Sequence, residues 1–277
     1  MAKKIQTGTW HCKDKKIKYS SKTIVMGILN VTPDSFSDGG RFIDCEKAVS
    51  HAFEMKNQGA DIIDIGAQST RPGFEEVPPE EEWQRLEGVL AALKGKIGVP
   101  VSVDTYFPSV AEKAVQAGAD IINDVSGVFN PDIAKIVKET GCGWIIMHNG
   151  EGNGDILHEV SSFFDEMVQK ATEFGIKRES ICLDMGIGFG KTYEQNLSLI
   201  SNISAYKKAG MPLLLGASRK RVIGAGSAQA NPAQRVFGNI AADCAAILGG
   251  ADIIRIHDVE NEIQGIKMAD ELKRVHL

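Results

Sequence analysis

Polar side chains that directly follow short apolar runs are the residues in this sequence whose types and spacing suit chemistry. A single Asp or Asn in such a place is commonly a helix cap or a turn residue, and Asp124 and His148 fit that explanation. Capping does not explain the whole series, because an unpaired carboxylate inside an apolar run would cost several kcal/mol. We therefore predict one shared polar pocket. Its members are Asn30, Thr70 with Arg71, Asp104, Asn123, His148, Asp184, Ser218 with Lys220, and Arg255 with His257.

This predicted pocket combines hydrogen-bond acceptors with cationic donors. Carboxylate and amide oxygens can accept parallel N–H bonds from the edge of an aminopyrimidinone-like ring, whereas guanidinium, ammonium and imidazole groups suit the oxygens of a diphosphate. The composition therefore favours a heterocycle that carries a phosphate tail. The acceptors are Asp104, Asn123 and Asp184, and the donors are Lys220, Arg255 and His257.

Three loops add detail to the pocket. Residues 30–40, NVTPDSFSDGG, are too rich in Pro, Asp, Ser and Gly for regular structure, so we expect a mobile lid there. Residues 68–73, QSTRPG, supply hydroxyl groups and a guanidinium. Residues 186–191, GIGFGK, place Phe189 between glycines, where its ring either covers a ligand or packs in the core. This last loop lacks the spacing of a nucleotide-binding P-loop.

An internal repeat indicates which elements position these residues. The pentapeptide Gly-Ala-Asp-Ile-Ile begins at Gly59, Gly118 and Gly250. Each copy follows a helix-like stretch and opens a β-branched apolar run, so each Gly suits the left-handed residue that ends a helix. The copies are 59 and 132 residues apart, which fits two and four strand-helix units of roughly 30 residues each.

The alternation continues through the chain and predicts the fold. Helix-period segments such as 46–57 and 163–174 separate the apolar runs, and Pro108, Pro131 and Pro232 stand near helix starts. Eight such units predict an α/β fold, a (βα)8 TIM barrel, as a single domain over residues 1–277. The residues before Thr23 would form a short N-terminal hairpin over the barrel floor. The predicted strands are 23–29, 62–65, 101–103, 121–123, 144–147, 181–183, 213–215 and 253–256.

Composition limits the classes of function. Apolar residues make up 43% and charged residues 24% of the 277 residues, as in ordinary globular proteins. A net charge of −5 gives no electrostatic reason to bind nucleic acid. The five cysteines form no C-x-x-C pair, which argues against a disulfide framework or a zinc site. Because neither a signal peptide nor a membrane span is evident, we expect a cytoplasmic protein without a membrane partner.

Eight stretches, taken in order and spacing, resemble the dihydropteroate synthase family from about Thr23 to Val259. The resemblance implies an enzyme of folate biosynthesis, a transferase and sulfonamide target. It would join 6-hydroxymethyl-7,8-dihydropterin diphosphate to para-aminobenzoate, giving 7,8-dihydropteroate and diphosphate. The stretches are MGILNVTPDSFSDGG from Met26, GADIIDIGAQSTRPG from Gly59, VSVDT from Val101, INDVSG from Ile122, MHN from Met147, LDMGIGFGKT from Leu183, GASRKR from Gly216 and IRIHDV from Ile254.

The same resemblance implies roles for individual residues. Asp104, Asn123, Asp184 and Lys220 would hold the pterin ring, with Met147 and Phe189 as apolar neighbours. The diphosphate would lie against Asn30, Arg255 and His257, with a Mg²⁺ cofactor near Asn30. Phe36, Thr70, Pro72 and Arg221 would border para-aminobenzoate, while Arg71 would move inward with its loop. A homodimer through the outer helices is also implied.

Loss of diphosphate is the demanding step of this reaction. Mg²⁺, Arg255 and His257 would stabilise the departing charge, and Lys220 and Asp38 complete the predicted catalytic set. An electron-rich pterin can share the positive charge left on its methylene carbon, which favours an SN1-like path. Asp38 is the residue that we expect to stabilise that cation, although an ordinary Asp-Gly turn explains it equally well.

Two other functions remain open at this point. A pterin-dependent corrinoid methyltransferase also binds a reduced pterin in such a barrel, but it has no diphosphate to release. A non-catalytic pterin-binding paralogue is suggested by departures from the family pattern, which usually has Glu at Gln68 and Pro at Met185. Arg221 also stands where the family often has Ser.

Overall fold

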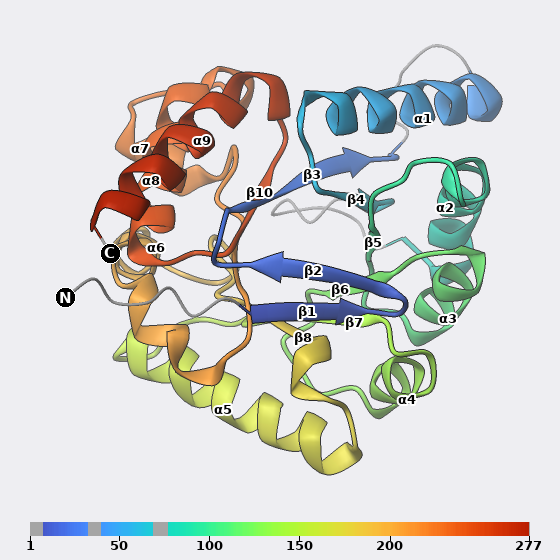
Figure 1. Cartoon of the computed structure of the whole chain (residues 1–277), viewed down its shortest axis with the longest axis horizontal. Coiled ribbons are helices and arrows are strands. Elements are labelled where there is room, and N and C mark those ends of the chain that lie inside the picture. The colour runs from blue at the N-terminus through green and yellow to red at the C-terminus, as the bar shows by residue number, and fades with distance from the viewer. Residues whose placement is uncertain (1–7, 33–39, 69–76, 277) are drawn as a thin grey trace.

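The computed structural model describes residues 8–32, 40–68 and 77–276, and within these ranges eight parallel strands close into a barrel. Each strand pairs with its neighbours in the order β10-β3-β4-β5-β6-β7-β8-β9, and helices surround the barrel (Figure 1). The predicted TIM barrel is confirmed. Its strands are β3 (Ile24–Asn30), β4 (Ile62–Gly66), β5 (Val101–Asp104), β6 (Ile121–Asp124), β7 (Gly143–Met147), β8 (Ile181–Asp184), β9 (Leu213–Leu215) and β10 (Ile253–Ile256).

Local sequence signals explain where the helices begin and end. Pro108 and Pro131 occupy the first turn of their helices, where the missing N–H costs nothing. Gly59, Gly118 and Gly250 have φ angles of 119°, 118° and 112°, so the repeated Gly does mark left-handed helix ends. The α-helices are α1 (Gly40–Gln58), α2 (Pro79–Leu93), α3 (Pro108–Ala117), α4 (Pro131–Thr140), α5 (Ile156–Phe174), α6 (Tyr193–Ser201), α7 (Arg221–Gly226), α8 (Val236–Gly249) and α9 (Val259–His276), with short 3₁₀ turns η2 (Arg178–Ser180), η3 (Ile203–Ala209) and η4 (Pro232–Gln234).

An antiparallel hairpin precedes the barrel, as predicted. Its strands β1 (Gly8–Cys12) and β2 (Lys15–Tyr19) pair from Gly8 with Tyr19 to Cys12 with Lys15. Trp10 is fully buried, and its Nε1 donates to the Ser180 carbonyl oxygen at 3.0 Å, just before β8 begins. Trp10 and Cys12 pack in one cluster with the inward residues at the starts of the barrel strands. The hairpin therefore closes the floor of the barrel.

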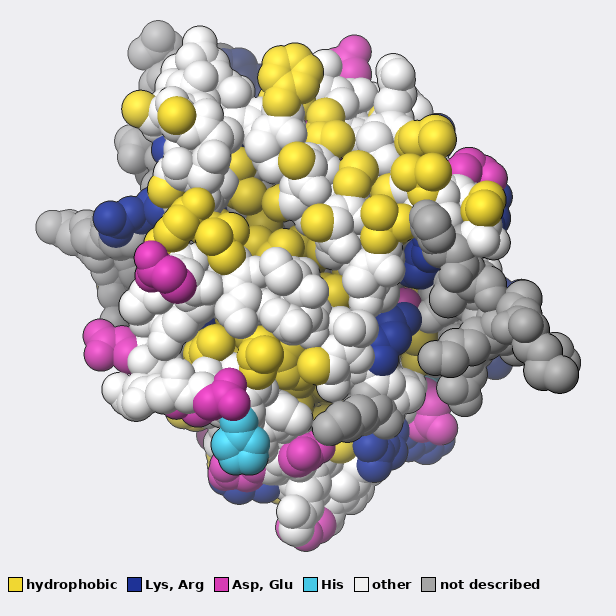
Figure 2. Space-filling model, turned by 90° about the vertical axis from the view of Figure 1, so that its left-hand side faces the viewer, with side chains coloured by type: hydrophobic (Ala, Val, Ile, Leu, Met, Phe, Trp, Pro, Cys, Tyr) yellow, Lys and Arg dark blue, Asp and Glu magenta, His cyan; other side chains and the backbone are white. Residues whose placement is uncertain are grey.

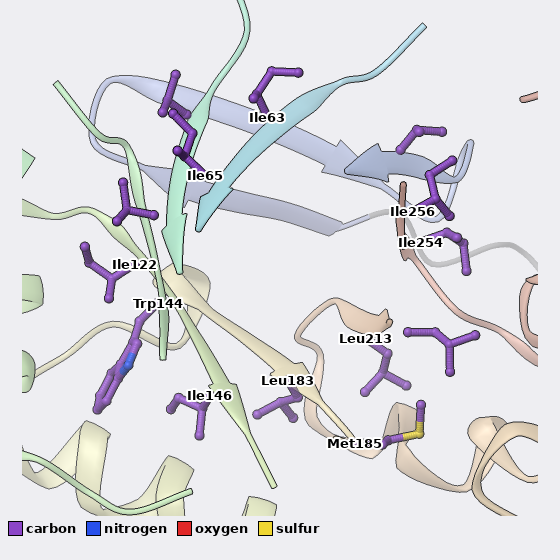
Figure 3. Close-up of a cluster of buried hydrophobic side chains, with 14 of the residues drawn as sticks. Ile63, Ile65, Ile122, Trp144, Ile146, Leu183, Met185, Leu213, Ile254 and Ile256 are labelled. Atoms are coloured by element: carbon purple, nitrogen blue, oxygen red, sulfur yellow. The ribbon is translucent and has the colours of Figure 1, made fainter. Parts of the chain in front are cut away.

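Alternate residues of each strand face opposite sides of the barrel wall. One set packs outward against the helices and includes Ile63, Ile122, Ile146, Leu183 and Ile254 (Figure 3). The other set faces inward and forms the floor cluster under the hairpin. Its strand members are Ile24, Met26, Ile62, Ile121, Ile145, Cys182, Leu214 and Ile253.

This alternation determines which side chains reach the open end of the barrel. Two residues beyond the floor cluster, the same inward positions carry mainly polar groups. We call this set the strand-end layer. Its members are Asp64, Asp104, Asn123, Met147, Asp184 and Arg255, of which Asp104 is placed by its register with Asn123 on the neighbouring strand.

Among the helices of the described residues, none is both long enough and apolar enough to cross a membrane.

Candidate active site

Arg255 lies between two carboxylates in the strand-end layer. Its Nε donates to Asp64 Oδ2 at 2.6 Å, and its Nη2 donates to Asp104 Oδ2 at 2.8 Å. Asn123 Nδ2 adds a hydrogen bond of 3.2 Å to the same Oδ2 of Asp64. The predicted residues Asp104, Asn123 and Arg255 therefore do meet, and Asp64 joins them although the sequence analysis did not single it out.

The electrostatics of this cluster follow from burial and from the shared guanidinium. Burial raises the pKa of Asp104 above the usual range, while the positive charge of Arg255 opposes that rise. Burial acts to lower the pKa of Arg255, but Asp64 and Asp104 outweigh it and hold that pKa above its ordinary value. Arg255 therefore stays charged.

Lys220 and Asp184 form a second charged group on the neighbouring part of the layer. Lys220 Nζ donates to the Ile187 carbonyl oxygen at 2.5 Å and lies 4.5 Å from the centroid of the Phe189 ring. Burial lowers the pKa of Lys220 to about 8, although Asp184 opposes this shift. Burial likewise raises the pKa of Asp184, with Lys220 opposing. The predicted residues Asp184, Phe189 and Lys220 are thus brought together, and the Phe189 ring faces a cation.

The GIGFGK loop is held by a lysine that the sequence analysis left without a role. Lys191 Nζ donates to the carbonyl oxygens of Gly186 at 2.9 Å, Phe189 at 3.0 Å and His148 at 3.2 Å. Asn196 Oδ1 accepts from the Gly188 amide at 2.7 Å. The signal available in the sequence was the Gly-x-Gly-x-Gly pattern, whose three glycines adopt left-handed φ angles of 68°, 83° and 69°.

His257 follows β10 and contacts the loop after β9. Its Nδ1 is 3.1 Å from Ser218 Oγ, and its backbone N–H donates to the same oxygen at 3.2 Å. Asn30 ends β3. Strand β10 lies between β9 and β3 in the barrel, so β3 is its second neighbour. Met147 is buried at the end of β7, on the inward face. Arg221 is exposed and begins α7.

Five predicted site residues lie outside the described residues. They are Phe36, Asp38, Thr70, Arg71 and Pro72, and the predicted lid over residues 30–40 is described only to residue 32 and again from residue 40.

The departures from the family pattern do not alter the described part of the pocket. Gln68 Nε2 donates to Tyr106 Oη at 2.8 Å, and its Oε1 accepts from the Val77 amide at 3.1 Å. Met185 is buried in the outer core against the helices. Neither side chain belongs to the strand-end layer.

Asp124 has the turn role that its sequence context indicated, whereas His148, which we also counted in the predicted pocket, packs its ring against a helix residue. Asp124 Oδ1 accepts from the Ser126 amide at 3.0 Å, which is a local turn. His148 packs edge-on against Phe163 with the ring centroids 5.1 Å apart, and burial lowers its pKa to about 4.

Two acceptors of the layer are not used within the described residues. Asn123 Oδ1 and Asp64 Oδ1 are buried and have no hydrogen-bond partner within the described residues. Native proteins pair most buried polar atoms, so such atoms point to a ligand that donates N–H bonds. Lys220, Arg255 and His257 supply donors beside them. The described residues therefore suit a ligand with an N–H-rich edge and an anionic part.

Three comparisons with known proteins agree with this geometry. The model of a family described as pterin binding enzyme matches residues 26–257. A dihydropteroate synthase of Synechocystis is 46% identical over 266 residues, covering 92% of each chain.

Among solved structures, a Clostridium difficile dihydropteroate synthase determined in the presence of pteroic acid has a TM-score of 0.88 and 42% identity, covering 92% of this chain and 98% of that one. A Xanthomonas albilineans dihydropteroate synthase with 4-aminobenzoic acid has a TM-score of 0.91 and 36% identity, covering 97% and 99%.

Proposed function

The chain belongs to the dihydropteroate synthases of the pterin binding enzyme family, and from that premise we propose how the strand-end layer carries the reaction. The enzyme condenses 6-hydroxymethyl-7,8-dihydropterin diphosphate with para-aminobenzoate to give 7,8-dihydropteroate and diphosphate. The relatives' names favour this reaction over methyl transfer to a corrinoid. The departures at Gln68 and Met185 lie outside the layer, which argues against a non-catalytic paralogue.

The unpaired buried acceptors carry the assignment of the pterin ring. Asn123 Oδ1 and Asp64 Oδ1 lack partners within the described residues, and Asp184 lies in the same layer. A pterin edge presents ring and exocyclic N–H groups that would pair with such oxygens. The Lys220 ammonium lies over the Phe189 ring. We therefore expect Phe189 to pack on the face of the pterin ring and Lys220 to meet the polar rim of the pterin. This arrangement supports the predicted pterin-binding roles.

We place the diphosphate toward Asn30, which ends β3, and His257, which directly follows the adjacent strand β10. Arg255 contributes positive charge there while its Nε and Nη2 remain engaged with Asp64 and Asp104. Preorganised donors that stabilise a departing anion commonly contribute more to catalysis than any other single effect. The roles of these residues rest on their position and charge.

The residues near Asn30 fit a bound Mg²⁺ when substrate oxygens supply most of its ligands. Among the described residues, no group of three or more His, Cys, Asp or Glu forms a metal cage. Mg²⁺ in phosphate sites commonly takes only one or two protein oxygens together with phosphates and waters. Asn30 offers one amide oxygen, and Gly66 beside it has no side chain to crowd it. When bound, Mg²⁺ would neutralise charge on the diphosphate oxygens.

The proposed path is dissociative. The bond between the methylene carbon and the diphosphate oxygen breaks first, and the electron pair leaves with the diphosphate. The neutral arylamine nitrogen then attacks the carbon and loses a proton, so the site needs no strong base. Asp184 and Asn123 would orient the ring by accepting its N–H groups, while the electron-rich pterin spreads the positive charge.

We further propose that the enzyme is a homodimer. Figure 2 views the side of the molecule on which α6 to α9 lie in Figure 1, and patches of apolar side chains lie on this face. Large apolar side chains exposed in quantity commonly mark an interface. Phe237 is 86% exposed. Analytical ultracentrifugation should therefore give a dimer for the parent and a monomer for the Phe237→Glu variant. The exposed large apolar residues of these helices are Tyr193, Leu197, Phe237, Leu248, Met268, Leu272 and Val275.

We propose a cytoplasmic location because none of the cysteines forms a disulfide. The five cysteines all fall within the described ranges and are free thiols, with Cys12, Cys142 and Cys182 buried. Unpaired thiols of this number are typical of a reducing compartment.

A coupled assay for released diphosphate tests the function. The parent protein with Mg²⁺ and both substrates should release diphosphate and form 7,8-dihydropteroate, detected by chromatography, in equal amounts. Lys220→Met should lower the rate by at least 10-fold, because it removes the half-buried ammonium that lies over the Phe189 ring. Failure of the parent to form dihydropteroate would refute the assignment.

A further inference from the structure

A buried polar cluster lies between α8 and α9, behind the loop that carries Lys220. Asn239 and Asp243 stand one turn apart on α8, and Glu262 is in the first turn of α9. Their exposed fractions are 0%, 1% and 0%. Nothing in the proposed reaction uses these three side chains, yet burying two carboxyl groups together is costly.

Asp243 and Glu262 interact electrostatically, and burial favours the protonated form of both carboxyl groups. Burial raises the pKa of Asp243 well above its usual range, and the neighbouring Glu262 raises it further. Burial also raises the pKa of Glu262. Two neighbouring carboxylates repel each other when both are ionised, so the neighbouring charge adds to burial in favouring a protonated carboxyl group in this pair. Glu262 Oε1 nevertheless remains an acceptor, because it receives a hydrogen bond from Asn239 Nδ2 at 3.1 Å.

The amide of Asn239 connects this pair to the active-site loop. Its Oδ1 accepts from the Arg219 backbone N–H at 3.0 Å, and its Nδ2 also donates to Ser218 Oγ at 3.4 Å. The orientation of the amide is determined, because the Arg219 N–H can face only the oxygen. Arg219 has φ of +61°, a left-handed conformation that is uncommon for a residue with a side chain. Asn239 therefore holds the loop in the conformation that presents Lys220.

The hydrogen bonds at Ser218 determine the state of His257. A serine hydroxyl can accept two hydrogen bonds and donate one. Ser218 Oγ accepts from the His257 backbone N–H at 3.2 Å and from Asn239 Nδ2. Its single proton is left for His257 Nδ1, which is 3.1 Å away. The imidazole nitrogen at that end must therefore be an acceptor, and a neutral ring with Nδ1 unprotonated carries its proton on Nε2.

We propose that Asn239 is a positioning residue which, backed by the Asp243–Glu262 pair and acting through Ser218, fixes His257 as the neutral Nε2–H tautomer. In the reaction this N–H is a donor for the diphosphate, a consequence that rests on the proposed function. The tautomer itself does not depend on it. An imidazolium would bring a third donor to Ser218 Oγ, which has no acceptor capacity left for it.

The tautomer is measured directly on full-length protein labelled with ¹⁵N-histidine. Long-range ¹H–¹⁵N spectra distinguish the protonated from the unprotonated ring nitrogen, and His257→Gln identifies the resonances of His257 among the six histidines. At a pH where the ring is neutral, the parent should show unprotonated Nδ1 and protonated Nε2. A parent spectrum with protonated Nδ1 would overturn the proposal without the need for any variant.

Asn239→Leu tests the connection, with Asn196→Leu as a matched control. Asn196 is also a buried asparagine that holds a loop, but it acts on Gly188. Asn239→Leu should give a mixture of His257 tautomers and weaken inorganic diphosphate binding with Mg²⁺ by about 10-fold, the loss of one hydrogen bond at about 1.4 kcal/mol. Asn196→Leu should leave the tautomer and the diphosphate affinity unchanged.

Two further results would contradict the proposal. A single Nε2–H tautomer in Asn239→Leu would show that Asn239 does not set it, and equal losses of diphosphate affinity in both variants would indicate a general packing defect. Ser218→Ala offers a second route if Asn239→Leu does not fold, and it should also release the tautomer. If the parent shows the Nε2–H tautomer yet forms no dihydropteroate, the proposed function fails while the positioning network stands.

Discussion

Asp64→Asn should measure what the buried contact with Arg255 contributes to stability. The Asp64 side chain is 0% exposed, and its Oδ2 receives the guanidinium at 2.6 Å and the Asn123 amide at 3.2 Å. A hydrogen bond to a charged group contributes about 1.5 to 3 kcal/mol, and breaking a buried ion pair outright costs about 3 to 5 kcal/mol. Asp104 remains at 2.8 Å in the variant, and an amide oxygen can still accept. We therefore expect a loss of about 2 kcal/mol.

A surface ion pair of the same length is the control. Lys170 Nζ and Glu166 Oε1 are also 2.6 Å apart, but their side chains are 47% and 62% exposed. Such pairs one helical turn apart contribute about 0.3 to 0.5 kcal/mol. Glu166→Gln removes one charge with the same atom count as Asp64→Asn. The two variants differ chiefly in burial.

Equilibrium urea unfolding, followed by circular dichroism and fluorescence, gives the comparison. We take the unfolding free energy to fall by about 3 kcal/mol per M of urea. The expected losses of stability then lower the unfolding midpoint by roughly 0.7 M for Asp64→Asn and by about 0.1 M for Glu166→Gln. Similar midpoints for the two variants would refute the reasoning. A more stable Asp64→Asn would mean that desolvation of the second carboxylate outweighs its attraction to Arg255.

Three further predictions concern single residues. Asp184→Asn should weaken pterin binding by roughly 10- to 100-fold in calorimetry, because ring N–H groups lose a carboxylate acceptor whose Oδ1 already accepts from the Gly186 amide; an affinity within twofold of the parent would remove Asp184 from the ring site. Lys191→Met should raise the pterin dissociation constant by about 10-fold with partial rescue in Lys191→Arg, since three carbonyl oxygens lose their ammonium; an unchanged constant would show that the GIGFGK loop holds itself. Burial lowers the His148 pKa to about 4 from an ordinary 6.5, so the unfolded chain binds the proton first and stability falls as pH drops from about 6.5 toward 4. The parent should lose up to about 3 kcal/mol more than His148→Phe over that range in urea unfolding, and parallel pH profiles would exclude this cause.

The arrangement of strands and helices followed closely from the sequence. All eight predicted barrel strands are present, and β9 and β10 have the predicted bounds. Where bounds differ, the strand usually runs one residue into the polar end, as β5 does at Asp104 and β8 at Asp184. For these two strands the prediction stopped at the last apolar residue, but a parallel ladder continues while its neighbour offers hydrogen-bond partners, whatever the side chain. Helix α5 starts at Ile156 rather than at 163 because Asp155 caps it, a signal present in the sequence.

Residues of the candidate site could be predicted where a polar side chain ended an apolar strand. They were missed where their position depends on a partner that is distant in the sequence. Asp104, Asn123, Asp184 and Arg255 were found at strand ends. Asp64 lies inside a strand that was interpreted as an apolar run, and its partner is 191 residues away. Only closure of the barrel brings the two together. Asn239 and Glu262 were missed for a similar reason. A polar residue on a helix is usually solvent-exposed, and the burial of these two side chains depends on how α8 and α9 pack.

The order of strands around the barrel gives the two sides of its open end, which we call the mouth, different chemical character. Asn30 and His257 are 227 residues apart in sequence, yet β3 and β10 are hydrogen-bonded neighbours, so both stand on one side. Asn123 on β6, Met147 on β7 and Asp184 on β8 occupy the opposite arc. A ligand spanning the mouth would thus meet Asn30 and His257 at one end and the ring-edge acceptors at the other. Arg255, tied across to Asp64 and Asp104, holds positive charge between these ends. A pterin with its diphosphate tail is polarised in that same sense, because its N–H-rich ring edge lies opposite the carbon that bears the leaving group.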